Sequence, residues 1–400
     1  MAQPESNGVF NPETPKSNTL SFIVVGSGQV VEKYWLSAME AGLVTIPAIL
    51  TLGSEAVFRS RHPEYSGEFV GSVNHDVIAH EIEKLLQLHP GAHVALAIPA
   101  DDRLALATAL LQSNEIDKKT IFFLEKPYAR SIEEIDAFAE LVEQYGERLH
   151  FSGKYAEGRA NILYDQLPQG VVPKKINAIL LEGSAYFAVV KNHVDTTVSH
   201  PYIKDGPELD LGFHLMDIIT TACARFGEVE AITINSVADL ATNNPACEPG
   251  YGFTATLRLT IKNDQGNEQD VAIELTAGKY DGPNHRNIFF TYDDFYIQQE
   301  YLVGKADDPV SRIDKVTNEW VELDRHFDGY QYYASELRPE SFGHQTELQQ
   351  KLSLDCTRIM IEIQKRRLNT AYSTLCYATP HAPRHRRITH KGQEAPFIPA

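Results

Sequence analysis

A short apolar run that leads directly into a glycine turn, and then into a stretch of helical length, constrains the fold of this chain most. Residues 21–25 read SFIVV, the turn reads GSGQ, and residues 30–41 have helical length. In such a unit the first glycine makes the tight turn, the second admits a pyrophosphate, and the helix N-terminus supplies unpaired N–H groups. The candidate nucleotide-binding residues of this turn are Gly26, Ser27, Gly28, Gln29 and Val30.

The glycine pattern is incomplete, and it leaves an alternative open. Val31 stands where the GxGxxG pattern has its last glycine, a position that governs how closely the helix meets the strand. A tight strand-to-helix turn also favours glycine for its own sake. The turn therefore favours a dinucleotide site without establishing one.

Strand-like and helical runs alternate along the first half of the chain, which is typical of βαβ units and a parallel sheet. The second half reads as strands joined by short turns, with one helix at about 210–226, which favours an antiparallel sheet. We therefore predict an α/β first half and an α+β second half. The expected boundaries are a flexible leader at 1–20, a dinucleotide-binding domain at 21–150, a second domain at 151–370 whose final helix covers about 345–368, and a tail at 371–400.

Charge and composition argue against several classes of protein. The 400 residues carry a formal net charge of −18, and so acidic a surface repels the phosphate backbones of nucleic acids. No apolar run approaches the roughly 18 residues of a membrane span, and the N-terminus lacks the pattern of a secretory signal. The four cysteines form no CxxC pair and the histidines show no metal-binding spacing. We expect a cytoplasmic protein with free thiols and no bound metal.

The end of the second predicted strand bears on the choice of cofactor. NAD-binding proteins usually place an acidic residue there to hold the ribose diol, but this strand tip carries none. Ser54 and Arg59 follow instead, with Arg61 nearby, and they would tolerate or contact a 2′-phosphate. This favours NADP over NAD, although the arginines would also fit a solvated loop.

A charged pair follows a buried strand at Glu125-Lys126-Pro127, and Pro99 ends the strand before it. The carboxyl end of a strand is where α/β proteins place their ligands, so Lys126 could donate to a substrate oxygen there. The Lys126–Pro127 peptide bond could be cis. The alternative is a plain surface turn, in which glutamate, lysine and proline are all common.

The helix near residue 210 carries a narrow polar stripe on an otherwise apolar surface. At about 100° per residue, Asp210, His214, Asp217 and Thr221 share one face. An apolar helix should be largely buried, and buried polar groups need partners. Histidine also has the side chain whose usual pKa suits proton transfer near neutrality. The alternative is an amphipathic helix with its polar face in water.

These segments, in this order, resemble the Gfo/Idh/MocA family of NAD(P)-dependent oxidoreductases across roughly residues 20–370. The motifs that carry the resemblance are VVGSGQVV, PADDR, FLEKPYA and DGPELDLGFHLMDII. The resemblance implies an N-terminal Rossmann domain, a second domain built on a large, mostly antiparallel open sheet, and homodimers or homotetramers. It also implies that Lys126 hydrogen-bonds the reacting oxygen, His214 acts as its acid/base, and Asp210 orients the substrate or the histidine. The substrate would be a sugar, a sugar derivative or a cyclitol.

The chain also departs from the family pattern. Arg103 stands where the family often has histidine, and residues 155–159 match it only loosely. The polar loop 191–204 precedes the helix with Asp210, so Lys191 and His193 are candidate substrate contacts, although a solvated loop fits equally well. Two other functions stay open: a non-catalytic regulator that senses NAD(P), and a glycosidase that uses its bound nicotinamide transiently.

Overall fold

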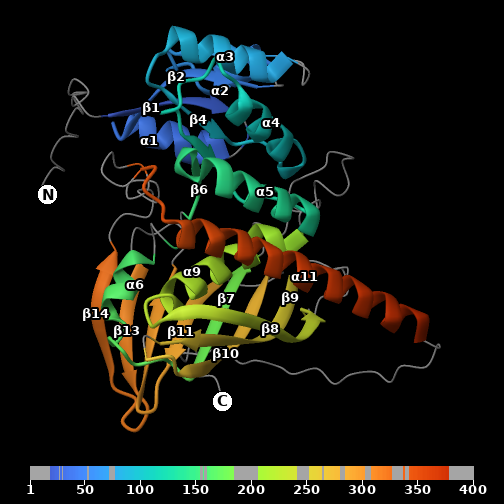
Figure 1. The fold of residues 1–400 in the computed structure, drawn as a ribbon. Helices are drawn as coiled ribbons and strands as arrows, with labels where there is room; N and C mark the ends of the chain where they lie inside the picture. The colour runs from blue at the N-terminus through green and yellow to red at the C-terminus, as the bar shows by residue number, and fades with distance from the viewer. Residues whose placement is uncertain are drawn as a thin grey trace, which may run out of the picture.

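A parallel sheet organises the first half of the protein, and Figure 1 shows it above a second, larger sheet. The structure is a computed structural model that describes residues 19–26, 28, 30–51, 54–71, 77–153, 156, 160–183, 206–240, 252–263, 265–279, 284–301, 308–326, 337 and 342–377. The strand order is β3–β2–β1–β4–β5–β6. The strands are β1 Leu20–Val25, β2 Val44–Leu50, β3 Glu68–Val70, β4 His93–Leu96, β5 Phe122–Leu124 and β6 Leu149–Phe151.

Helices connect these strands, as expected for parallel neighbours. A π-helical turn, Val31–Trp35, leads into α1, and its fully buried Val31 and Trp35 pack on the sheet. A side-chain cap begins helix α5, because Ser131 Oγ accepts a hydrogen bond from the Glu134 N–H at 3.1 Å. The helices are α1 Leu36–Glu40, α2 Glu55–Arg61, α3 Ile78–Leu88, α4 Ala100–Gln112 and α5 Ile132–Tyr145.

Eight strands form the second sheet, in the order β14–β13–β12–β11–β7–β10–β9–β8. Neighbours run antiparallel except for β7 and β10, which are parallel. The predicted fold class is therefore confirmed. The strands are β7 Lys175–Glu182, β8 Glu228–Asp239, β9 Gly252–Lys262, β10 Glu268–Lys279, β11 His285–Thr291, β12 Phe295–Glu300, β13 Asp308–Asp314 and β14 Trp320–His326.

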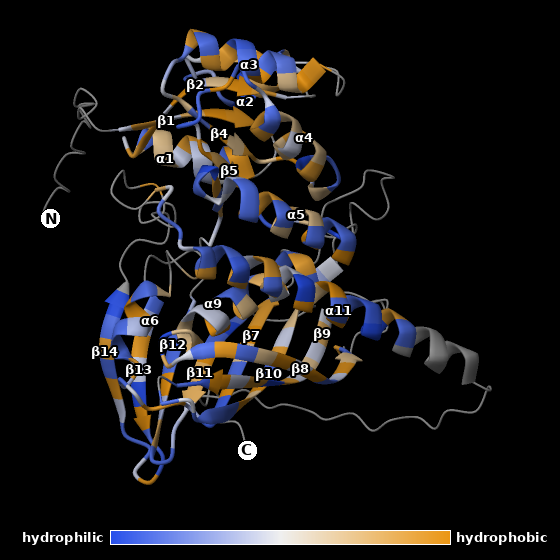
Figure 2. Cartoon of the chain, in the orientation of Figure 1, coloured by the Kyte–Doolittle hydropathy of each residue, from blue (hydrophilic) through white to orange (hydrophobic). Residues whose placement is uncertain are grey.

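Two helices, α9 Phe213–Cys223 and α11 Glu347–Tyr377, lie between the large sheet and the parallel sheet, while α6 Asn161–Gln166 lies near β13 and β14 (Figure 1). Almost every residue of α9 is buried, as its apolar sequence predicts. Apolar residues follow the strands of both sheets (Figure 2), and one buried apolar cluster runs continuously from the parallel sheet to the large one. The two sheets are thus joined by a shared core.

The segment before α11 returns to the parallel sheet. Leu337 and Phe342 belong to the apolar cluster on that sheet's other face, where Phe342 stacks on His150. The side-chain amide of Gln345 pairs with the backbone of Phe151, its Oε1 accepting at 2.8 Å and its Nε2 donating at 2.7 Å. This contact satisfies the open edge of β6 in the way that an added strand would.

The sequence reading missed several elements and misjudged the length of one. It did not predict β3, β6, β13, β14 or α6, and it treated α2 as a loop. The final helix begins at Glu347, close to the predicted start, but continues to Tyr377. Of the predicted leader and tail, the structure describes residues 19–20 and the backbone of 371–377.

Candidate active site

The glycine turn lies between β1 and β4, where the order of successive strands across the parallel sheet reverses. Gly26 has a φ of +126°, and a Cβ atom there would come within 2.4 Å of the Ala97 carbonyl oxygen. Its N–H donates to the Leu50 carbonyl at 2.7 Å, so three strand ends meet at this residue. Gly28 is exposed with open space where its Cβ would be, which leaves room for a phosphate to approach the backbone. Ser27 and Gln29 lie outside the described residues.

Of the two residues predicted to meet the ribose, Ser54 is open to solvent and Arg59 is engaged within the protein. Ser54 is exposed and precedes α2 without capping it through its side chain. Arg59 donates to the Glu55 carboxylate at 2.7 Å and to the backbone carbonyls of Tyr65 and Gly67 at 3.1 and 3.4 Å. Arg59 therefore holds the α2–β3 connection, and a 2′-phosphate would have to compete with these acceptors.

A buried arginine, Arg103, holds the turn that carries Lys126 through hydrogen bonds to backbone carbonyl oxygens. The Lys126–Pro127 bond is cis, and Glu125 beside it is buried. Arg103 of α4, only 2% exposed, donates to the carbonyl oxygens of Pro127 and Ile98. These carbonyls follow β5 and β4, so Arg103 joins two strand ends at the ligand-binding edge. Pro99 lies exposed at the start of α4 on the same edge.

Lys126 meets Asp210 from the other half of the chain. Its Nζ donates to the backbone carbonyl of Asp210 at 2.6 Å and to the carboxylate Oδ1 at 2.9 Å. Asp210 belongs to a π-helical turn, Glu208–Gly212, that continues into α9, and π-helical turns are frequent at functional sites. The structure therefore brings together two residues that the sequence separates by 84 positions.

His214 follows on the first turn of α9 and is 5% exposed. Asp217, one turn further along, is buried to the same extent, while Thr221 is half-buried. The hydroxyl of neighbouring Thr220 lies 3.1 Å from the Cys356 Sγ on α11. The polar stripe thus faces protein rather than water at His214 and Asp217, which removes the solvated-face alternative for that part of the helix.

Asp210 contacts a second lysine. Lys279 Nζ, at the end of β10, lies 3.4 Å from Asp210 Oδ2 and 3.2 Å from Glu182 Oε2 at the end of β7. Arg286 of β11 completes the set with a 2.8 Å contact to Glu182 Oε1. Burial alone would raise the pKa of Asp210, but the two lysines outweigh it and hold that pKa well below its usual range. Sequence reasoning missed these residues, whose signal was a charge at the end of each apolar strand.

Other predicted features fall elsewhere. Lys191, His193 and residues 155 and 157–159 lie outside the described residues. Within the described residues, no group of three or more histidine, cysteine or acidic side chains is placed to hold a metal ion, and no helix is long and apolar enough to span a membrane. Cys223 and Cys356 are buried free thiols.

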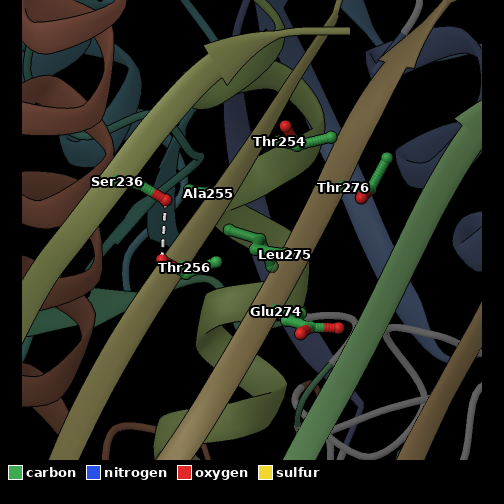
Figure 3. Close-up of a pocket in the computed structure, with 7 residues that line it drawn as sticks. All are labelled: Ser236, Thr254, Ala255, Thr256, Glu274, Leu275 and Thr276. Atoms are coloured by element: carbon green, nitrogen blue, oxygen red, sulfur yellow. Dashed lines mark hydrogen bonds between the residues drawn. The ribbon is translucent and has the colours of Figure 1, made fainter. Parts of the chain in front are cut away.

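A shallow hollow of about 230 Å³ lies on strands β8, β9 and β10 (Figure 3). Five of its seven lining residues carry polar side chains, and the hydroxyls of Ser236 and Thr256 hydrogen-bond across it at 2.7 Å. It contains none of the predicted site residues. The lining residues are Ser236, Thr254, Ala255, Thr256, Glu274, Leu275 and Thr276.

Sequence comparison finds no matching family model and no matching curated protein. Solved structures do match. The 3-ketoreductase KijD10 from Actinomadura kijaniata, in complex with NADP and TDP-benzene, aligns at 15% identity over 88% of this chain and 98% of its own, with a TM-score of 0.60.

The UDP-N-acetylglucosamine 3-dehydrogenase GnnA from Acidithiobacillus ferrooxidans aligns at 13% identity over 87% of this chain and 98% of its own, with a TM-score of 0.58. A ketoreductase and a dehydrogenase are both oxidoreductases, the class of enzyme that the resemblance of the sequence motifs implies. Across nearly its whole length, this chain therefore shares the fold of these two proteins.

Proposed function

We propose that this protein is an NADP(H)-dependent oxidoreductase that transfers a hydride between the nicotinamide and a hydroxyl or keto carbon of a sugar, a sugar derivative or a cyclitol. The observation that carries the proposal is the meeting of Lys126 with Asp210, one turn before the buried His214. The lysine comes from the carboxyl end of a strand in the parallel sheet, which is where such folds place their ligands. The shared fold with two sugar oxidoreductases supports it.

The residues of the glycine turn fit a dinucleotide. Gly26 allows the close approach of β1 to β4, and the open space at Gly28 suits a pyrophosphate. Ser27, Gln29, Val30, Ser54, Arg59, Pro99 and Glu125–Pro127 complete the proposed cofactor-binding set. NADP is preferred because the end of β2 supplies no described acidic residue for a ribose diol, and because KijD10 was solved with NADP. NAD is the alternative cofactor.

The nicotinamide would supply the hydride chemistry, and the chain's own residues position and protonate the reacting oxygen. Lys126 uses two of its three N–H donors on Asp210, so one remains to polarise a carbonyl or hydroxyl. His214 takes the hydroxyl proton during oxidation and returns it during reduction. Asp210 holds the ammonium in place, and Lys191 and His193 are proposed to contact the substrate.

We propose a dinucleotide-binding domain at 21–150 and a substrate domain at 151–370, a boundary that falls within β6 of the parallel sheet. We also propose a cytoplasmic homodimer or homotetramer that assembles through the large sheet. The face of β8–β10 that turns away from α9 carries exposed polar residues such as those of Figure 3. Light scattering after gel filtration tests the assembly, and a monomer at micromolar concentration would contradict it.

A thermal-shift titration with NADPH and NADH in parallel tests the cofactor. A ligand at 100 times its Kd adds about 2.7 kcal/mol to the free energy of unfolding, which corresponds to a shift of a few degrees. We expect a larger shift with NADPH. A shift with NADH alone would overturn the cofactor preference. No shift with either, in protein shown to contain no co-purified nucleotide, would contradict the nucleotide site.

A substrate screen tests the reaction. We expect the nicotinamide absorbance to change when NADPH meets keto sugars, or when NADP meets sugars, cyclitols and nucleotide-linked sugars. Binding of NADPH without any such change would favour a regulator. Sugar hydrolysis without net change of the nicotinamide would favour a glycosidase.

A further inference from the structure

We propose that Lys279 is a positioning residue of the active site, which holds one carboxylate oxygen of Asp210 so that the other stays directed at Lys126. This proposal deepens the proposed function and rests on it. Lys279 lies on β10 of the large sheet, 153 residues after Lys126 along the chain. No catalytic contact is assigned to it, because it acts through Asp210.

The two lysines divide Asp210 between them. Lys126 Nζ takes Oδ1 at 2.9 Å and the backbone carbonyl at 2.6 Å, while Lys279 Nζ lies 3.4 Å from Oδ2. A carboxylate with a cation on each oxygen cannot rotate about its Cβ–Cγ bond without losing a contact. Lys279 therefore fixes the plane of the carboxylate that holds Lys126.

Strand pairing fixes Lys279 in turn. Lys279 ends β10 and Glu182 ends β7, and the parallel register makes them Cα partners. Glu182 also has a cation on each oxygen, with Lys279 on Oε2 at 3.2 Å and Arg286 on Oε1 at 2.8 Å. Charges of alternating sign thus run from Arg286 through Glu182, Lys279 and Asp210 to Lys126.

The burial of Lys279 shows that this arrangement is more than a surface ion pair. Its residue is 7% exposed, and burying an ammonium costs several kcal/mol unless partners compensate. Glu182 already has Arg286 as a second partner, so Lys279 is not needed to neutralise that carboxylate. The contact of Lys279 with Asp210 connects the large sheet to the π-helical turn. Through Asp210, this contact would position Lys126 for the reaction.

The charge around Asp210 makes the role measurable through pH. Lys126 faces it from the turn after β5 and Lys279 faces it from β10. Glu208 and His214 lie on its own helix, and Arg367 of α11 is engaged with Glu208. Since Lys279 is one of the two cations that lower the pKa of Asp210, its removal raises that pKa.

The test compares Lys279→Met, Lys279→Arg and a matched control, Lys175→Met. Lys175 begins β7 and contacts Glu274 of β10 at 2.8 Å, so it makes the same cross-strand ion pair at the far end of the same strands. We expect Lys279→Met to lower kcat/KM on the order of 10²-fold and to raise the pKa of Asp210. Lys279→Arg should recover most of the activity, and Lys175→Met should leave the activity and the pH profile unchanged.

A readout without turnover separates this proposal from the proposed function. In protein labelled with ¹³C at the aspartate carboxyl carbons, the Asp210 signal, assigned with Asp210→Asn, should titrate at a higher pH in Lys279→Met than in the wild type. A wild type without turnover would refute the function, while this titration would still decide whether Lys279 holds Asp210. An unchanged Asp210 titration, or full activity in Lys279→Met, would overturn the proposal.

Discussion

Two ion-pair networks meet on one π-helical turn, Glu208–Gly212, and they differ in how far water reaches them. The side chain of Glu208 is fully buried against Arg367, whose side chain is 6% exposed and also contacts Asp239 at 3.0 Å. The side chain of Asp210, two residues later, keeps 28% exposure while it holds Lys126. The Glu208–Arg367 pair is closed within the protein, whereas Asp210 remains accessible to a ligand.

The pKa values of Glu208 and Asp210 are also shifted in opposite directions. Burial raises the pKa of Glu208, although Arg367 opposes that shift. At Asp210 burial acts in the same direction, but Lys126 and Lys279 outweigh it and lower the pKa. The difference indicates a structural role for the closed pair, which anchors α11, and a chemical role for the open one, which keeps an anion beside Lys126.

The largest expected effect is on catalysis in the open network. Lys126→Met and His214→Ala should each lower kcat by roughly 10²–10⁴-fold, because one removes the donor to the reacting oxygen and the other removes the acid/base. Steady-state kinetics with the best substrate of the screen measures this effect. Urea unfolding serves as the control, since a large loss of stability in Lys126→Met would assign that lysine to the structural class.

The closed network should respond in stability instead. Arg367→Met leaves Glu208 buried without its partner and should lower the free energy of unfolding by about 3–5 kcal/mol. Adding Glu208→Gln should restore part of that loss, because the uncompensated charge is gone. Urea unfolding monitored by circular dichroism gives the free energy of unfolding of both variants. A loss below about 1 kcal/mol in Arg367→Met would contradict a structural role for the buried pair.

The two carboxyl groups should give opposite pH dependences of stability. The depressed pKa of Asp210 contributes stability above about pH 4, the unfolded value, and this is lost as the pH falls further. The raised pKa of Glu208 makes stability fall as the pH rises above about 4.5. Asp210→Asn should therefore reduce the loss of stability in acid and Glu208→Gln should increase it, each by at most about 1.4 kcal/mol per pH unit. Slopes that change in the same direction would contradict the contrast.

The smallest effect is expected at an exposed ion pair. Arg358 of α11 contacts Asp136 of α5 at 2.6 Å, with side chains 38% and 61% exposed. Arg358→Ala should cost about 1 kcal/mol or less, since water screens such pairs. Urea unfolding of Arg358→Ala gives the loss for an exposed ion pair, with which the loss in Arg367→Met is compared. Equal losses in the two variants would show that burial does not make the Glu208–Arg367 pair the stronger one.

Much of the fold could be predicted from local patterns. Strands followed by glycine or proline define the parallel sheet, and the short turns between the later strands indicate the antiparallel one. The short strands β3 and β6 and the polar-faced β14 carry too little apolar pattern to stand out. The return of Phe342 to the first sheet depends on tertiary packing that no local pattern encodes.

The candidate site was predictable where its residues stand in local motifs, and not where tertiary structure places them. Lys126, Asp210 and His214 stand in motifs, and their elements lie where the motifs place them. Lys279, Glu182 and Arg286 stand in none, because strand order alone makes β7 the neighbour of both β10 and β11. The positive charge of Arg59 suits a phosphate. The sequence does not show that its guanidinium donates instead to three acceptors in the α2–β3 connection and its neighbouring helix.

A double-mutant cycle on kcat/KM with Lys126→Met and Asp210→Asn tests the central claim most directly, namely that the two halves of the chain build one catalytic pair. If the residues act as a unit, the double variant should lose about as much activity as Lys126→Met alone, because residues that act together are strongly non-additive. Losses that simply add, in variants that remain folded and bind NADPH, would show that the two residues act independently and would contradict the account.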